Sequence, residues 1–175
     1  MNSASLAGRL RANPLSAAAF AISLVAAATL AGAWFFEIVL RLEPCPLCLD
    51  QRFPYYIAVP LGLAVGALAR TKQRTTLARI GLVVLGIVML VGAGYGVYHS
   101  GVEWGLWEGP TACAAGAPGT SGDILSSLKT ATRVVPCNEA AWRFLGLSLA
   151  GYNALIAGAL AALAFYTAFS APRSS

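Results

Sequence analysis

The stretch LSAAAFAISLVAAATLAGAWFFEIVLRLEPCPLCLDQR, residues 15–52, joins a long apolar run to a short polar segment that holds two cysteines. The apolar run covers residues 15–40. Because about 20 apolar residues span the hydrocarbon core as a helix, this run predicts a membrane helix. A helix is expected because an isolated strand would leave its backbone groups unpaired in lipid.

Three further apolar runs follow, at residues 53–69, 80–98 and 145–169. The chain is 58% hydrophobic and 11% charged, whereas a soluble domain carries roughly a quarter charged residues. We therefore predict an all-α membrane protein, a bundle of four transmembrane helices in one domain spanning residues 1–175. The second run is short for a membrane span, so we expect flanking residues to extend the helix. The first is too long for the apolar part of a signal peptide, about 7–15 residues.

The basic residues predict how the chain is oriented in the membrane. Arg9 and Arg11 precede the first run, Arg173 follows the last, and the connection between the second and third runs holds four basic residues and no acid. Since cytoplasmic loops carry the excess of Lys and Arg, both termini are expected to be cytoplasmic. Loops 41–52 and 99–143 are then periplasmic. The net charge of +5 is interpreted as an orientation signal and a lipid contact, not as a nucleic-acid surface.

All four cysteines, Cys45, Cys48, Cys113 and Cys137, fall in these two outer loops. Disulfides persist in the periplasm, so the sorting favours two disulfides. The sequence leaves three pairings open.

Zinc is disfavoured, because Cys113 and Cys137 are far apart in sequence and His99 is the only histidine. No metal is therefore expected. Two structural disulfides in a non-catalytic four-helix membrane protein remain the main alternative. Against that alternative, a Cys-x-x-Cys ring closes few residues and stabilises little, and such rings are better suited to thiol exchange.

Cys48 is expected to lie just before the second helix, where the helix N-terminus favours a thiolate. Arg52 would favour the same thiolate or bind a polar ligand, although it could instead be an interfacial anchor. Pro54 suits a first helical turn, which predicts that the helix begins one to several residues after Cys48.

Three motifs together resemble the DsbB family, the quinone:disulfide oxidoreductases of bacterial inner membranes. These motifs are PCPLCLDQR (44–52), YHSGVEWGLW (98–107) and CNEAAWRFLGLSLAGYN (137–153). A rival resemblance, to vitamin K epoxide reductase, is disfavoured because its quinone-proximal Cys-x-x-Cys lies late in the chain.

The DsbB resemblance implies that Cys113 and Cys137 exchange with a periplasmic DsbA-type dithiol, and that Cys45 and Cys48 pass the electrons to a membrane quinone, for which we expect ubiquinone in preference to menaquinone. We predict that Cys113 is attacked first, because its Gly/Pro-rich flank should leave it accessible, and that Cys48 is the donor thiolate, because it lies at the start of the second helix. The same resemblance puts Arg52 and His99 at the quinone site.

Four features depart from the family or add to the resemblance. Gln51 stands where a better-known member has an acidic residue, and residues 112–123 are rich in small residues, Gly and Pro. Within residues 121–135 an apolar stripe predicts a short interfacial helix in the second loop. Gly-x-x-x-Gly patterns at 62–66 and 92–96 predict close helix approach inside the bundle.

Overall fold

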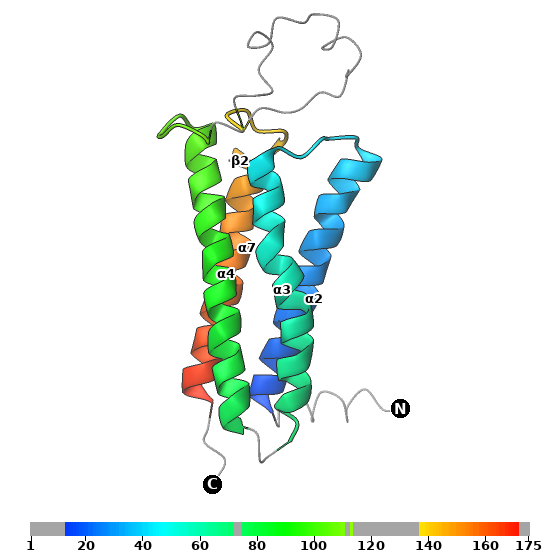
Figure 1. The fold of residues 1–175 in the computed structure, drawn as a ribbon, viewed down its shortest axis with the longest axis vertical. Coiled ribbons are helices and arrows are strands. Elements are labelled where there is room, and N and C mark those ends of the chain that lie inside the picture. Colours follow the sequence, from blue (N-terminus) through cyan, green and yellow to red (C-terminus); the bar gives the residue numbers. More distant parts are fainter. Residues whose placement is uncertain (1–12, 72–74, 111–112, 114–136, 172–175) are drawn as a thin grey trace, which may run out of the picture.

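The chain folds into long helices that run side by side, shown in Figure 1 as a computed structural model. The structure describes residues 13–71, 75–110, 113 and 137–171. Its elements in this part of the chain are α2 (Pro14–Trp34), a π-helical turn η1 (Phe35–Val39), α3 (Pro46–Leu68), α4 (Thr75–Glu103), β1 (Arg143–Phe144), β2 (Leu147–Ser148) and α7 (Leu149–Ser170). The predicted mostly helical architecture is confirmed.

Three helical stretches in the described part are long and apolar enough to cross a membrane. They are Pro14–Val39, Thr75–Glu103 and Leu149–Ser170, with mean hydropathies of 1.9, 2.3 and 1.6. The remaining long helix, α3, is not among them, because polar Gln51 and Arg52 and two prolines dilute its apolar sequence. The predicted count of four spans therefore has direct support for three.

The helix ends differ from the predicted ones. The second helix begins at Pro46 instead of near residue 53, and Pro54 lies inside it. Proline suits the first helical position because it has no N–H to leave unpaired. The third helix runs from Thr75 to Glu103 and so includes His99. The helix predicted within residues 121–135 lies outside the described residues.

The fourth helix begins at Leu149 instead of near residue 145, because a small hairpin comes first. Its turn residues Leu145 and Gly146 both have positive φ, 49° and 82°, as two-residue hairpin turns of type I′ require. The Ser148 hydroxyl then accepts a hydrogen bond from the Gly151 N–H at 3.2 Å and caps the helix.

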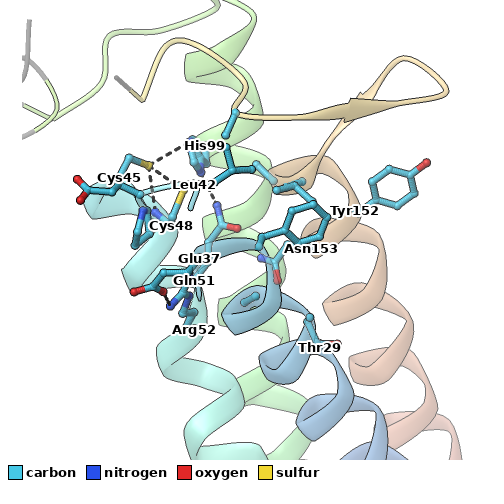
Figure 2. A pocket seen from close by; sticks show the side chains of 18 of the residues that line it. Thr29, Glu37, Leu42, Cys45, Cys48, Gln51, Arg52, His99, Tyr152 and Asn153 are labelled. Atoms are coloured by element: carbon cyan, nitrogen blue, oxygen red, sulfur yellow. Dashed lines mark hydrogen bonds and ion pairs between the residues drawn. The ribbon is translucent and has the colours of Figure 1, made fainter. Parts of the chain in front are cut away.

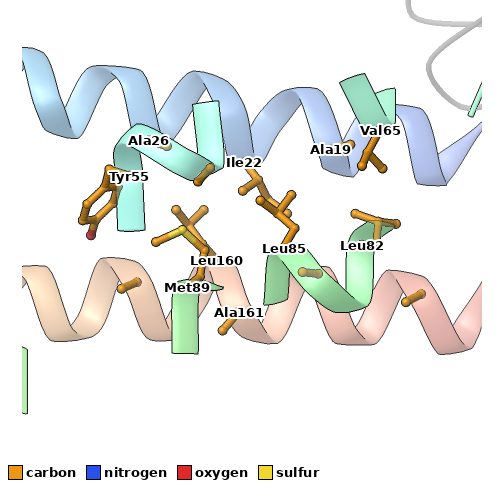
Figure 3. Packing of buried hydrophobic residues seen from close by; sticks show 14 of the residues in the cluster. Ala19, Ile22, Ala26, Tyr55, Val65, Leu82, Leu85, Met89, Leu160 and Ala161 are labelled. Carbon is orange, nitrogen blue, oxygen red and sulfur yellow. The ribbon is translucent and has the colours of Figure 1, made fainter. Parts of the chain in front are cut away.

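Small residues let the helices pack closely. Alanines of α2 and α7 surround larger side chains such as Ile22, Leu85 and Met89 in the buried core (Figure 3). A Cβ atom on Gly62 would lie 2.9 Å from the Ala19 carbonyl oxygen, and one on Gly96 would lie 2.7 Å from the Ala154 nitrogen. Both glycine patterns therefore serve close approach within the bundle, as predicted.

Buried polar side chains tie the helices together below the Cys-x-x-Cys. The Tyr55 hydroxyl donates to the Asn153 side-chain oxygen at 2.6 Å, and the Asn153 amide donates to the Gly92 carbonyl at 3.4 Å. These bonds join α3, α7 and α4. At the opposite end of the bundle, Arg79 donates to the carbonyls of Ala168 and Ala171, at 2.6 Å each.

Candidate redox site

A cavity of about 290 Å³ opens where the start of α3 meets the end of α4, the start of α7 and the α2–η1 segment. Figure 2 shows its polar side, which includes Cys45, Cys48, Arg52 and His99. The opposite walls are mostly apolar and come from α2, η1 and α7, among them Gly32, Ala33, Phe36, Leu149 and Ile156. The structure thus brings four of the six predicted site residues to one cavity.

Cys45 and Cys48 form the first turn of α3. Cys45 is the N-cap residue, and its Sγ accepts a hydrogen bond from the Cys48 N–H at 3.3 Å. The two Sγ atoms are 2.9 Å apart, and both cysteines are free thiols. Cys45 is buried and Cys48 is half-buried. Placing the cysteines in the first turn brings the two sulfurs together at the helix N-terminus.

This geometry favours the thiolate on Cys45 in the reduced pair, and the role of Cys48 as the thiolate that donates to a quinone stays a prediction. The hydrogen bond from the Cys48 thiol lowers the pKa of Cys45 to about 5, with further help from His99, although burial opposes the shift. The predicted effect of a helix N-terminus is real. It acts on Cys45 because the helix begins seven residues earlier than the predicted residue 53.

His99 lies between the cysteines and two polar residues: Gln51, noted from the sequence only as a departure from the family, and Glu103, which was not predicted to belong to the site. Its Nε2 lies 3.7 Å from the Cys45 Sγ, and its Nδ1 lies 2.6 Å from Nε2 of Gln51. If the Gln51 amide donates to Nδ1, the ring proton sits on Nε2 and points toward Cys45.

Glu103 lies one helical turn beyond His99, with its Oε1 3.9 Å from the His99 Nε2 and its side chain 4% exposed. Its Oε2 finds no hydrogen-bond partner among the described residues. The i,i+4 spacing of His99 and Glu103 was the available signal. It was missed because the third helix was predicted to end at residue 98.

Arg52 forms an ion pair with Glu37 at the cavity wall, and the Arg52 side chain is 12% exposed. Glu37 lies in the π-helical turn η1, which interrupts the regular helix near the C-terminal end of the first candidate span. The predicted roles for Arg52 were a ligand contact or an interfacial anchor, and the structure shows a mostly buried cation facing the cavity.

The second cysteine pair lies against the first. Cys113 and Cys137 form a disulfide, the pairing that the resemblance implies and that the sequence alone left open. Cys137 is 1% exposed and packs with Cys45, Leu47 and Val102, and Cys48 and Cys113 contact the same cluster. All four cysteines therefore meet in one small region of the fold.

The chain is similar to known proteins over most of its length. The family model described as disulfide bond formation protein DsbB matches residues 16–167. The disulfide bond formation protein B of Marinobacter nauticus is 33% identical over 83% of this chain and 86% of its own length. The disulfide bond formation protein B of Xanthomonas euvesicatoria pv. vesicatoria is 32% identical over 87% of this chain and 89% of its own length. The uncharacterized protein RP370 of Rickettsia prowazekii is 28% identical, over 77% and 75%. No solved structure matches the chain.

Proposed function

The chain belongs to the DsbB family of disulfide bond formation proteins, and from this premise we propose that it reoxidises a periplasmic DsbA-type dithiol with a membrane quinone. As a family member it is a membrane disulfide oxidoreductase. The proposal adds the electron donor, the acceptor and the order of the cysteines between them.

The observation that carries the proposal is the contact between the two cysteine pairs in one buried cluster. Thiol–disulfide exchange requires a thiolate to reach a disulfide sulfur directly. Cys137 is buried beside Cys45, and Cys113 is half-buried. These positions support Cys113 as the sulfur open to a partner and Cys137 as the sulfur that acts internally.

The proposed path conserves electrons and protons at each exchange. A partner thiolate attacks Cys113, the Cys113–Cys137 bond breaks, and Cys137 leaves as a thiolate. The partner's second thiol then releases the oxidised partner. Cys137 attacks the Cys45–Cys48 disulfide, and closure of Cys113–Cys137 leaves the first pair as a dithiol.

The cavity fits a quinone headgroup, because apolar walls face a side that offers Arg52, His99 and a thiol pair. A bound quinone would supply the acceptor for two electrons and two protons. Within that site, Arg52 would place positive charge near an oxygen that becomes more negative, and His99 would hold a proton near Cys45. Closing the Cys45–Cys48 disulfide releases the electron pair. The proposed acceptor is ubiquinone in preference to menaquinone.

The same proposal includes the arrangement in the membrane. The whole chain, residues 1–175, forms one domain in the bacterial inner membrane, with α3 as a fourth span and both termini in the cytoplasm. Segments 41–52 and 99–143, which include the start of α3 and the end of α4 and hold all four cysteines, then face the periplasm, where the partner is found. A purely structural pair at 45 and 48 is less favoured, because these thiols lie beside His99 and line a cavity.

The test measures quinone reduction by the purified protein with a reduced DsbA-type partner. Wild type should form one quinol for each partner dithiol oxidised, and Cys48→Ser should abolish turnover. Cys137→Ser should accumulate a mixed disulfide with the partner through Cys113. Turnover in Cys48→Ser, or trapping of the partner through Cys45, would contradict the proposed electron path.

A further inference from the structure

Three metal-ligating groups converge on the polar side of the cavity. The Sγ atoms of Cys45 and Cys48 and a ring nitrogen of His99 lie within 4.8 Å of one another. Zinc was disfavoured from the sequence because Cys113 and Cys137, the other two cysteines, are far apart in the chain. The fold supplies the third donor from α4 instead, because that helix extends past His99 to Glu103.

The distances are close to those of a tetrahedral site. Ligand atoms around Zn²⁺ stand about 3.5–3.8 Å apart when Zn–S is about 2.3 Å and Zn–N about 2.0 Å. The Cys45 Sγ to His99 Nε2 distance is 3.7 Å. The two sulfurs are 2.9 Å apart, so they must separate by about 0.9 Å to hold such an ion. Cys48 is only half-buried, which leaves its side chain room to move.

Glu103 offers a fourth ligand. Its Oε1 lies 3.9 Å from the His99 Nε2, its side chain is 4% exposed, and Oε2 has no hydrogen-bond partner among the described residues. A buried carboxylate oxygen without a partner is costly. Glu103 lies outside the set of three groups whose ligand atoms are all within 4.8 Å of one another, so its carboxylate must move closer to the sulfurs to bind a cation held there.

Gln51 can support the ring of His99 in either state. Its amide nitrogen lies 2.6 Å from Nδ1. When the His99 Nε2 binds a metal, Nδ1 must carry the proton, and a rotated Gln51 amide would accept it through its carbonyl oxygen. Histidine ligands commonly donate their second N–H to such a partner.

We propose that the reduced Cys45–Cys48 pair, His99 and Glu103 form a site for a thiophilic divalent cation such as Zn²⁺, and that the bound ion blocks oxidation of the pair. Binding forms two metal–sulfur bonds, one to the Cys45 thiolate and one to Cys48, whose thiol releases its proton, and no electron moves. The blocking effect rests on the proposed function, whereas the metal site itself does not. An oxidised pair has no thiolate to offer, so only the reduced protein binds.

The experiment titrates Zn²⁺ against a chromophoric chelator in reduced, quinone-free, full-length protein in detergent. Wild type should bind one ion, and Co²⁺ in its place should give the absorption spectrum of tetrahedral thiolate ligation. Cys113→Ser/Cys137→Ser should keep this site, and Cys45→Ser/Cys48→Ser should lose it. Protein with an oxidised first pair should not bind. Binding that persists without Cys45 and Cys48 would overturn the site.

Single variants test the other ligands. Glu103→Gln should weaken binding about tenfold or more, whereas Glu108→Gln, at an exposed acid on the following loop, should not change it. Gln51→Leu should weaken binding about 10–100-fold, as loss of a partner that orients a histidine ligand does. Equal affinity in wild type and Glu103→Gln would remove Glu103 from the site.

Turnover with reduced partner and quinone is then measured with and without saturating Zn²⁺. Zn²⁺ should stop wild-type turnover and a chelator should restore it. An active enzyme that binds no Zn²⁺ contradicts the metal site, and undiminished turnover with Zn²⁺ bound contradicts the block. An inactive protein that binds Zn²⁺ contradicts the proposed function and leaves the metal site supported.

Discussion

Nδ1 of His99 lies 2.6 Å from the side-chain nitrogen of Gln51, and Nε2 of the same ring lies 3.7 Å from the sulfur of Cys45. The imidazole therefore bridges an amide on one side and a thiol on the other. An amide N–H that donates to Nδ1 leaves the proton on Nε2, where it can be donated to the Cys45 thiolate. The hydrogen bond from Gln51 to Nδ1 therefore determines that Nε2, the ring nitrogen that faces Cys45, carries the proton.

The first prediction concerns this tautomer. Gln51→Met removes the donor to Nδ1 with little change in volume, so the preference for a proton on Nε2 should fall. Because His99 is the chain's only histidine, histidine-selective ¹⁵N NMR of metal-free protein reports it as a single residue. An unchanged tautomer in Gln51→Met would show that Gln51 does not control the ring.

The second prediction concerns pH. The pKa of Cys45 is lowered from its usual value to about 5, so the thiolate is present above that pH and is lost as the pH falls through it. Ultraviolet thiolate absorbance of the reduced, chelator-treated protein should therefore show a transition near pH 5. Cys48→Ala removes the largest cause of the shift, the thiol hydrogen bond, and should move the transition to higher pH. A transition in wild type near the usual cysteine pKa would contradict the assignment.

The third prediction concerns Arg52. A donor aimed at developing charge in a water-poor site is worth about 3 kcal/mol, so Arg52→Gln should slow quinone reduction roughly a hundredfold. Arg52→Lys keeps the positive charge but not the planar guanidinium group, so it should slow quinone reduction less than Arg52→Gln does. Glu37→Gln removes the ion-pair partner but keeps Arg52 in the cavity, so it should also slow quinone reduction less than Arg52→Gln does. Wild-type quinone affinity and rate in Arg52→Gln would leave Arg52 as an interfacial anchor.

The fourth prediction concerns packing between α4 and α7. Gly96→Ala would put a methyl group 2.7 Å from the Ala154 backbone nitrogen, which should lower stability in detergent by about 1–3 kcal/mol. Gly94 lies on the same helix with nothing within 4 Å of an added Cβ. Gly94→Ala should instead raise stability slightly, because alanine suits a helix better than glycine. Thermal unfolding of the two variants in detergent makes the comparison, and equal melting temperatures would count against the packing argument.

The fifth prediction concerns orientation. Cys113 should react with a membrane-impermeant thiol reagent in intact cells after reduction. A cysteine introduced at Thr75, at the start of α4, should stay unlabelled until the membrane is opened. The reverse pattern would place both cysteine pairs on the cytoplasmic side.

The sequence predicted the helical bundle well, because long apolar runs have few other folds in lipid. It predicted the helix ends less well. Pro54 indicated a late start for the second helix, yet it is accommodated inside α3 beside Gly92, where an added Cβ would lie 3.2 Å from it. Pro46, which suits a helix start equally well, was the better signal.

The sequence predicted only part of the site. Cys45, Cys48, Arg52 and His99 were selected from their spacing and from a family resemblance, and the structure brings them to one cavity. Glu37 could not be selected as the partner of Arg52, because that ion pair depends on how η1 turns at the end of the first span. Gln51 and Glu103 acquire their relation to His99 only once α3 and α4 are packed together.

The apolar walls of the cavity come from α2, η1 and α7, which are helices at the lipid boundary with exposed large side chains such as Phe35, Ile38 and Leu155. If the proposed function holds, a quinone that enters between such walls would come from the acyl chains and not from water. Its effective concentration is then its mole fraction in the lipid phase. Adding ligand-free lipid or detergent should raise the apparent half-saturation value by surface dilution, even when the amount of quinone per millilitre is unchanged.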